Sequence, residues 1–104
     1  MQVHPVDPRD TRWEVDHPAY RVYFWHYEQP RDPHGGWVSD EWQIEDADVD
    51  EVLNWARDNA DGRRFVVYAR VVCGQLGEPG LIRLLGTDPS TSYLGLTTAS
   101  LEGR

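Results

Sequence analysis

The sequence predicts an α+β fold in which a four-stranded antiparallel sheet carries one helix on one face. Two observations support this fold. One helical segment with clear start and end signals lies between two pairs of strand-like segments, which gives the element order ββαββ. Two of the strand-like segments are apolar on both faces, so we expect them in the centre of the sheet, where both faces are covered. The expected strand order is therefore 2-1-3-4.

The helix is expected to begin after Asp48 and to end at Gly62. Asp48 is a suitable N-cap, and Glu51 completes a capping box three residues later. Gly62 can adopt the left-handed conformation that commonly ends a helix. Apolar residues recur at helical spacing along one side, namely Val49, Val52, Leu53, Ala56 and Ala60. This stripe predicts that the helix packs on one face of the sheet.

The four strands differ in which of their faces are apolar. Residues 20–28 form the most aromatic segment of the chain, and residues 64–72 are rich in β-branched side chains on both faces. Residues 41–45 alternate between polar and apolar, which is typical of an edge strand, with Trp42 and Ile44 expected to face the core. Residues 81–85 form the returning strand. With the first strand placed between the second and the third, all neighbouring strands are antiparallel.

A chain of 104 residues is expected to form a single domain. We expect residues 1–18 to form an extended N-terminal arm and residues 19–90 to form the α+β domain. Residues 91–104 form a C-terminal segment that is either docked on the domain or disordered. No apolar run is long enough to cross a bilayer, and the N-terminus lacks the features of a signal peptide. Together with the single cysteine, Cys73, these features predict a cytoplasmic location and no membrane partner.

The formal net charge is −8, and all ten basic side chains are arginines. An acidic surface repels nucleic acid and anionic lipid, so we expect no nucleic-acid partner. The use of arginine without lysine is what GC-rich codon usage produces. The composition therefore predicts a protein from a high-GC bacterial genome.

A pattern between residues 37 and 89 resembles small uncharacterised proteins of high-GC actinobacteria. It consists of Trp37-x-Ser39-Asp40-Glu41-Trp42, Asp46-Ala47, Glu51-Val52-Leu53-x-Trp55-Ala56, Asn59-Ala60, Gly62-Arg63 and Leu84-x-Gly86-x-Asp88-Pro89. The resemblance covers about half of the chain and includes no diagnostic motif. It implies a source and a fold, and it implies no activity and no functional residue.

The sheet face opposite the helix is the first candidate for a functional surface. It combines aromatic side chains with arginine, a composition typical of protein interfaces. The candidate interaction residues are Tyr23, Trp25, Tyr27, Tyr68 and Arg70. Three covers for this face are considered: a segment of the chain itself, a second copy of the protein, or a ligand or foreign protein. The primary hypothesis is a non-enzymatic interaction module that forms a homodimer through this face.

A run of acidic residues is the second candidate, with seven carboxylates within twelve residues and no basic residue among them. The candidate residues are Asp40, Glu41, Glu45, Asp46, Asp50 and Glu51. Helix capping and the solvent face of an edge strand account for most of these carboxylates. The alternative is an acidic immunity or inhibitor protein that blocks the basic site of a partner.

Patterns that indicate catalysis or metal binding are weak. His26 and Cys73 are the one pair that resembles a base and a nucleophile, and the other histidines are not spaced as metal ligands. Gly74, Gly77 and Gly80 precede a strand and not a helix, so they do not indicate a phosphate-binding loop. A small enzyme or ligand-binding protein with a pocket near His26 and Cys73 is the third hypothesis. We expect no cofactor and no metal, and an enzyme is the less favoured class.

Overall fold

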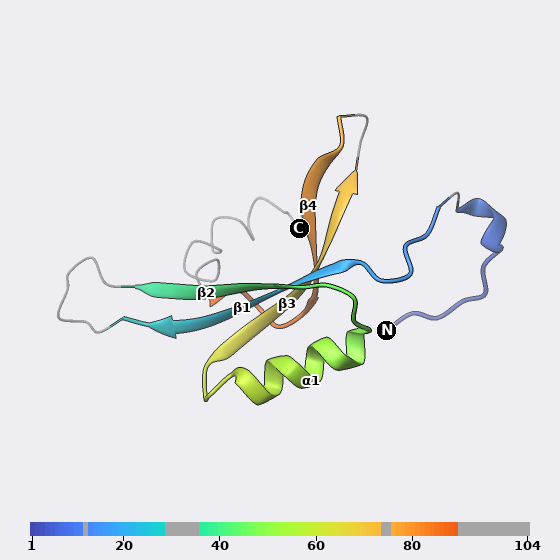
Figure 1. The fold of residues 1–104 in the computed structure, drawn as a ribbon. Coiled ribbons are helices and arrows are strands. Elements are labelled where there is room, and N and C mark those ends of the chain that lie inside the picture. Colours follow the sequence, from blue (N-terminus) through green and yellow to red (C-terminus); the bar gives the residue numbers. More distant parts are fainter. Residues whose placement is uncertain (12, 29–35, 74–75, 90–104) are drawn as a thin grey trace, which may run out of the picture.

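The computed structural model of the chain describes residues 1–11, 13–28, 36–73 and 76–89. In this part of the chain, four strands form one antiparallel sheet in the order β2-β1-β3-β4, and α1 lies on one of its faces (Figure 1). The elements in chain order are the 3-10 turn η1 (Pro8–Asp10), β1 (Ala19–Tyr27), β2 (Trp37–Ile44), α1 (Val49–Asn59), β3 (Arg64–Cys73) and β4 (Glu78–Leu85). The predicted α+β fold and its strand order are confirmed.

The strand β1 is central and sets the two faces of the sheet. It pairs with β2 along its length and with β3 as far as Arg70, which lies opposite Ala19. Because successive side chains of a strand point to opposite faces, Val22 and Phe24 face α1, whereas Tyr23 faces away from it. These two faces are the ones that the sequence predicts.

The hydrophobic core lies between α1 and the helix-facing side of the sheet. Its buried members are Tyr20, Val22, Phe24, Val52, Ala56, Ala60, Val67 and Ala69. Ile44 packs against this cluster, as predicted, whereas Trp42 remains 48% exposed and rests on Trp55. Val49 belongs to the predicted apolar stripe but is exposed, because it is the first residue of α1.

α1 begins where the capping box predicts, but it ends at Asn59 with Ala60 as its C-cap, so Asp61 precedes the predicted Gly62 as the first left-handed residue. The backbone N–H of Asp48 donates to Oε1 of Glu51 at 3.0 Å, which is one half of the capping box. At the other end, Asp61 and Gly62 both have positive φ, at 54° and 80°. Gly62 therefore adopts the predicted left-handed conformation, and Asp61 does so as well.

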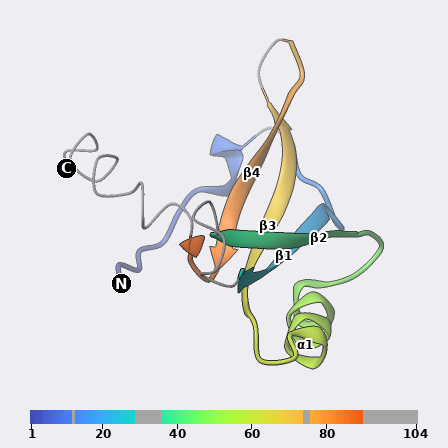
Figure 2. The ribbon, with the colours of Figure 1, turned by 90° about the vertical axis from the view of Figure 1, so that its left-hand side faces the viewer.

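The β3–β4 hairpin extends beyond the rest of the sheet. The residues of β3 after Arg70 have no β1 partner and pair only with β4. Two perpendicular views show this part of the hairpin projecting away from α1 (Figures 1 and 2). We call it the outer hairpin and define it as Val71–Cys73 together with Glu78–Ile82. Its β3 residues have no β1 partner, and its β4 residues Leu81 and Ile82 lie opposite Arg70 and Ala69, the end of the β3 segment that pairs with β1.

The N-terminal arm contains the turn η1 and no strand in its described residues. Asp7 caps this turn by accepting a hydrogen bond from the backbone N–H of Arg9 at 3.0 Å. The C-terminal segment 91–104 lies outside the described residues. α1, the longest helix in the described part of the chain, has neither the length nor the apolar character of a membrane-spanning helix.

Candidate functional site

The predicted interaction residues Tyr23, Trp25, Tyr27, Tyr68 and Arg70 lie on the face opposite α1. Their rings make pairwise contacts. The centroids of Tyr23 and Tyr68 are 5.1 Å apart, and Tyr27 meets Trp37 edge to face at 5.3 Å. The structure thus brings the five residues to one face, where Tyr23 with Tyr68 and Tyr27 with Trp37 form aromatic pairs between neighbouring strands.

Most of this aromatic face is already partly covered. Tyr23, Trp25, Tyr68 and Arg70 are half-buried, and only Tyr27 among the five residues is more than half exposed, at 53%. Burial raises the pKa of Tyr68 above its ordinary value of 10.0, and Asp88 and Tyr23 raise this pKa further while Arg83 lowers it. The aromatic face is therefore not the most exposed apolar surface of the described residues.

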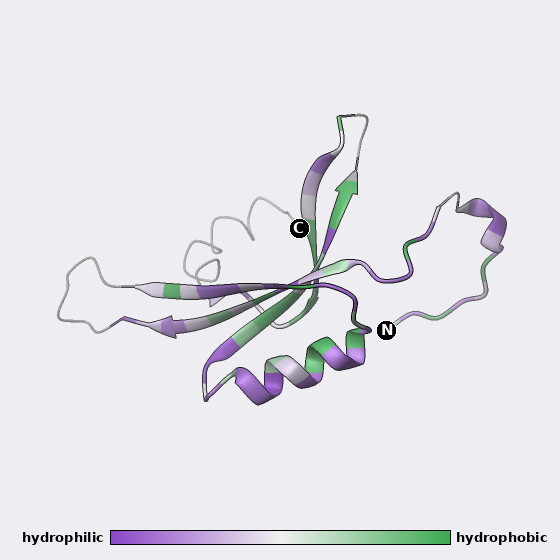
Figure 3. Cartoon of the chain, in the orientation of Figure 1, coloured by the Kyte–Doolittle hydropathy of each residue, from purple (hydrophilic) through white to green (hydrophobic). Residues whose placement is uncertain are grey.

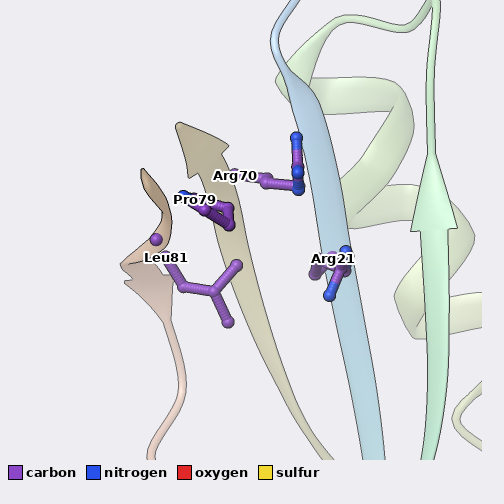
Figure 4. Close-up of a pocket in the computed structure, with 5 residues that line it drawn as sticks. Arg21, Arg70, Pro79 and Leu81 are labelled. Atoms are coloured by element: carbon purple, nitrogen blue, oxygen red, sulfur yellow. The ribbon is translucent and has the colours of Figure 1, made fainter. Parts of the chain in front are cut away.

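A small pocket opens on the same face, beside the aromatic pairs. It is lined by Arg21 of β1, Arg70 of β3, and Pro79, Gly80 and Leu81 of β4, and has a volume of about 240 Å³. In Figure 4 both arginine side chains lie along β1, and Pro79 and Leu81 face them from β4. One wall of the pocket is thus cationic, and the other is largely apolar.

Exposed apolar side chains lie in the N-terminal arm, and within the sheet four of them lie on the outer hairpin and beside it. Val72, Leu81, Ile82 and Leu84 are between 41% and 52% exposed. Figure 3 shows β3 as hydrophobic along most of its length, whereas the central part of β2 is hydrophilic. β4 is an edge strand, so its outer backbone groups have no strand partner among the described residues. We call Val72, Leu81, Ile82 and Leu84 the apolar hairpin surface. Val72 and Leu81 point to the face opposite α1 and Ile82 points to the helix-facing side, so this surface wraps around the β4 edge.

A groove of about 550 Å³ adjoins the apolar hairpin surface. It separates the N-terminal arm, with Trp13 and Val15, from the β3 residues 69–72. Both arm residues are exposed. This surface is not among the sequence predictions, although Leu81, Ile82 and Leu84 are apolar on both faces of a strand that ends the sheet. That pattern was the available signal.

The predicted acidic patch does not form one surface. Asp40 lies opposite Phe24 on the helix-facing side, where its Oδ2 accepts a hydrogen bond from Nε1 of Trp42 at 3.0 Å and lies 3.5 Å from Nη1 of Arg63. Glu41 lies opposite Tyr23 and so points to the other face. The alternation of side chains along β2 therefore divides the patch between both sides of the sheet.

The remaining acidic candidates lie at the start of α1 and before it. Glu51 is engaged in the capping box, and Glu45 accepts a hydrogen bond from Nε2 of Gln43 at 2.8 Å. Asp46 and Asp50 are exposed. Glu45 and Glu51 also line a groove of about 470 Å³ whose walls include Trp42 and Trp55.

His26 and Cys73 do not form a catalytic pair. The β1–β3 ladder is antiparallel, and His26 lies beyond one end of it whereas Cys73 lies beyond the other. At about 3.3 Å per residue, the two positions are separated by most of the length of β3. In the described residues, no cluster of three or more His, Cys, Asp or Glu side chains is arranged to hold a metal ion.

Comparisons with known proteins give no further guide to the site. No protein-family model matches the chain, and neither the curated proteins nor the solved structures contain a significant match. The resemblance to small actinobacterial proteins therefore stays a prediction.

Proposed function

We propose that the protein is an interaction module that self-associates, and that a second copy docks on the apolar hairpin surface. The observation that carries this proposal is the exposure of Val72, Leu81, Ile82 and Leu84 on and beside one edge strand. The proposal keeps the homodimer of the primary sequence hypothesis. It moves the contact from the aromatic face to the β4 edge.

The free energy for association comes from apolar burial and from the open strand edge. Full burial of one large aliphatic side chain contributes about 1.5–3 kcal/mol. The outer backbone groups of β4 can also pair with another strand, which is why exposed apolar edges associate. Antiparallel pairing of two β4 strands uses the same patch on both copies and gives a closed two-fold dimer.

The opposite edge of the sheet is unsuited to this role. β2 carries Asp40 and Glu41, and the chain continues directly into Glu45 and Asp46. Two copies of such an edge would place like charges together, and charge on an edge strand is a common protection against strand pairing. The acidic alternative also loses support, because its residues are divided between two faces and partly engaged in capping.

The test is the solution mass of the full chain, measured by light scattering after gel filtration over a concentration series. We expect a dimer for the wild type and a monomer for Ile82→Lys. Burial of an unpaired ammonium should weaken association by about 100-fold or more, corresponding to about 3 kcal/mol. Ile82 is 52% exposed in the single chain, so the substitution should leave the fold intact by circular dichroism.

Two control variants identify the contact surface. Val38→Lys introduces the same charge on the β2 edge at an exposed position and should leave the dimer intact. Tyr27→Ala removes the most exposed of the five aromatic-face candidates and should also leave it intact. A wild type that stays monomeric at the highest concentration would contradict self-association. A dimer lost in Tyr27→Ala but kept in Ile82→Lys would return the contact to the aromatic face.

A further inference from the structure

Arg21 and Arg70 lie on the sheet face opposite α1 and line the same pocket. Arg21 lies opposite Tyr68, and Ala19 lies opposite Arg70, so the two arginines are diagonal neighbours on adjacent strands. Both side chains line one pocket, and both lie along β1 (Figure 4). Two like charges in this arrangement repel each other, and an anion between them removes the repulsion.

Neither arginine has an acidic partner within the described part of the chain. The ion pairs of arginine found there involve Arg9 and Arg63. Arg21 and Arg70 are nevertheless both half-buried, and the whole chain has 18 carboxylates for 10 arginines. Partly desolvated arginines usually face an anion, because desolvation without one is unfavourable. The other described arginines without an acidic partner are exposed, whereas these two are half-buried and line one pocket, and this arrangement points to an anion from outside the chain.

A hydrogen-bond chain orients one of the two guanidinium groups. Nε of Arg21 donates to Oε1 of Gln43 at 2.7 Å, and Nε2 of Gln43 donates to Oε2 of Glu45 at 2.8 Å. Arg21 thus uses its Nε within the protein, and its two Nη groups remain for a ligand. A group held in this way loses less rotational freedom when a ligand binds.

The other wall of the pocket limits the chemistry of the anion. Pro79, Gly80 and Leu81 offer carbon atoms opposite the guanidinium groups. A volume of about 240 Å³ is below the 300–1,000 Å³ that is typical of pockets for drug-sized ligands. The ligand must therefore be small, with a charged end for the arginines and a short apolar part for β4.

We propose that this pocket binds a small organic carboxylate. Its carboxylate group lies between Arg21 and Arg70, and its apolar chain lies against Pro79 and Leu81. The planar guanidinium matches a carboxylate, because its N–H groups form a fork that can bond both oxygens. Inorganic phosphate matches the charge but has no apolar part to bury against β4.

The first experiment is an NMR titration of the full chain at low ionic strength with hexanoate. Two comparison probes are used. Hexanamide has the same chain length as hexanoate but no charge, and inorganic phosphate has charge but no chain. We expect hexanoate to shift the backbone signal of Leu81 and the Nε–Hε signals of Arg21 and Arg70. Hexanamide and phosphate should each bind at least about 10-fold more weakly. Equal affinity for hexanamide or for phosphate would overturn the carboxylate assignment.

Variants of the two walls provide the second arm. Arg70→Gln should weaken hexanoate binding by about 10-fold or more, whereas Arg64→Gln, an exposed arginine at the other end of β3, should leave it unchanged. Leu81→Ser should weaken hexanoate but leave acetate unchanged, because acetate has no chain to reach β4. Unchanged hexanoate affinity in Arg70→Gln would refute the site.

The pocket and the dimer contact share Leu81, so the titration is repeated on Ile82→Lys. This variant is the monomer under the proposed function, and it keeps all five residues that line the pocket. We expect the same hexanoate affinity as in the wild type. Loss of binding in this monomer, with the fold retained, would show that the single-chain pocket is not the binding site.

Discussion

Val66 and Val72 are the same residue type on the same strand and the same face, yet Val66 is fully buried and Val72 is 52% exposed. Val66 lies opposite Tyr23 of β1, and the backbone at Gly86 passes beside it. Val72 has Pro79 of β4 on one side and no β1 residue on the other, because the β1–β3 ladder ends at Arg70. Burial on this face thus depends on the strands alongside and not on the residue.

The helix-facing side of the sheet likewise has a buried part and an exposed part. α1 has 11 residues and is therefore about 16 Å long. β3 has 10 residues and is therefore about 33 Å long. Phe24 and Val67 lie under α1, whereas Ile82 lies in the outer hairpin and is 52% exposed. A helix of this length cannot cover the full strand, so exposed apolar side chains remain on the outer hairpin.

The largest expected effect on stability is in the part of the sheet that α1 covers. Phe24→Ala removes the ring that meets Trp55 and Phe65 and that lies 4.5 Å from the guanidinium of Arg63. We expect a loss of about 3–5 kcal/mol in the free energy of unfolding, measured by urea denaturation. Ile82→Ala, measured at concentrations where the protein is monomeric, should change this free energy by less than about 0.5 kcal/mol. Similar losses in both variants would mean that the outer hairpin is packed.

Val66 and Val72 test the comparison between buried and exposed positions of β3 with the residue type held constant. Val66→Ala should lower the free energy of unfolding by about 2 kcal/mol, from lost apolar burial and the cavity that remains. Val72→Ala should lower it by less than about 0.5 kcal/mol under monomeric conditions. If dimerisation buries Val72, the same variant should weaken the dimer at higher concentration. A large loss for Val72→Ala in the monomer would contradict the exposure of this residue.

The sequence was sufficient for the fold because the relevant signals are local. Asp48 with Glu51 fixes the start of α1, Gly62 marks its end to within a few residues, and alternation along β1 assigns each side chain to a face. The start of β4 was predicted too late, because Pro79 and Gly80 are typical of loops. Both are tolerated here because β4 is an edge strand, where a missing N–H need not interrupt a ladder.

The candidate site could be predicted only in part, for a physical reason. Alternation shows to which face Tyr23 or Tyr68 points, but it does not show whether another strand or a helix covers that face. Leu81 and Ile82 point to opposite faces, a pattern that is also typical of a strand covered on both sides. The Arg21–Arg70 pair depends on the register between β1 and β3, which no local signal in the sequence determines.

The smallest expected effect concerns Tyr68, which lies at the β-bulge in the β3–β4 ladder. Burial raises its pKa above 10.0 in the folded chain, so the unfolded chain releases the phenol proton at lower pH. The stability from the protonated phenol is fully present below pH 10.0 and is lost as the pH rises through the folded-state pKa. When the pH is raised from neutral to above the folded-state pKa, the free energy of unfolding of Tyr68→Phe should therefore fall less than that of the wild type. Urea denaturation at each pH measures this difference. Equal losses would mean that water reaches Tyr68 freely, and the face opposite α1 would then be open along β3 and not only at Val72.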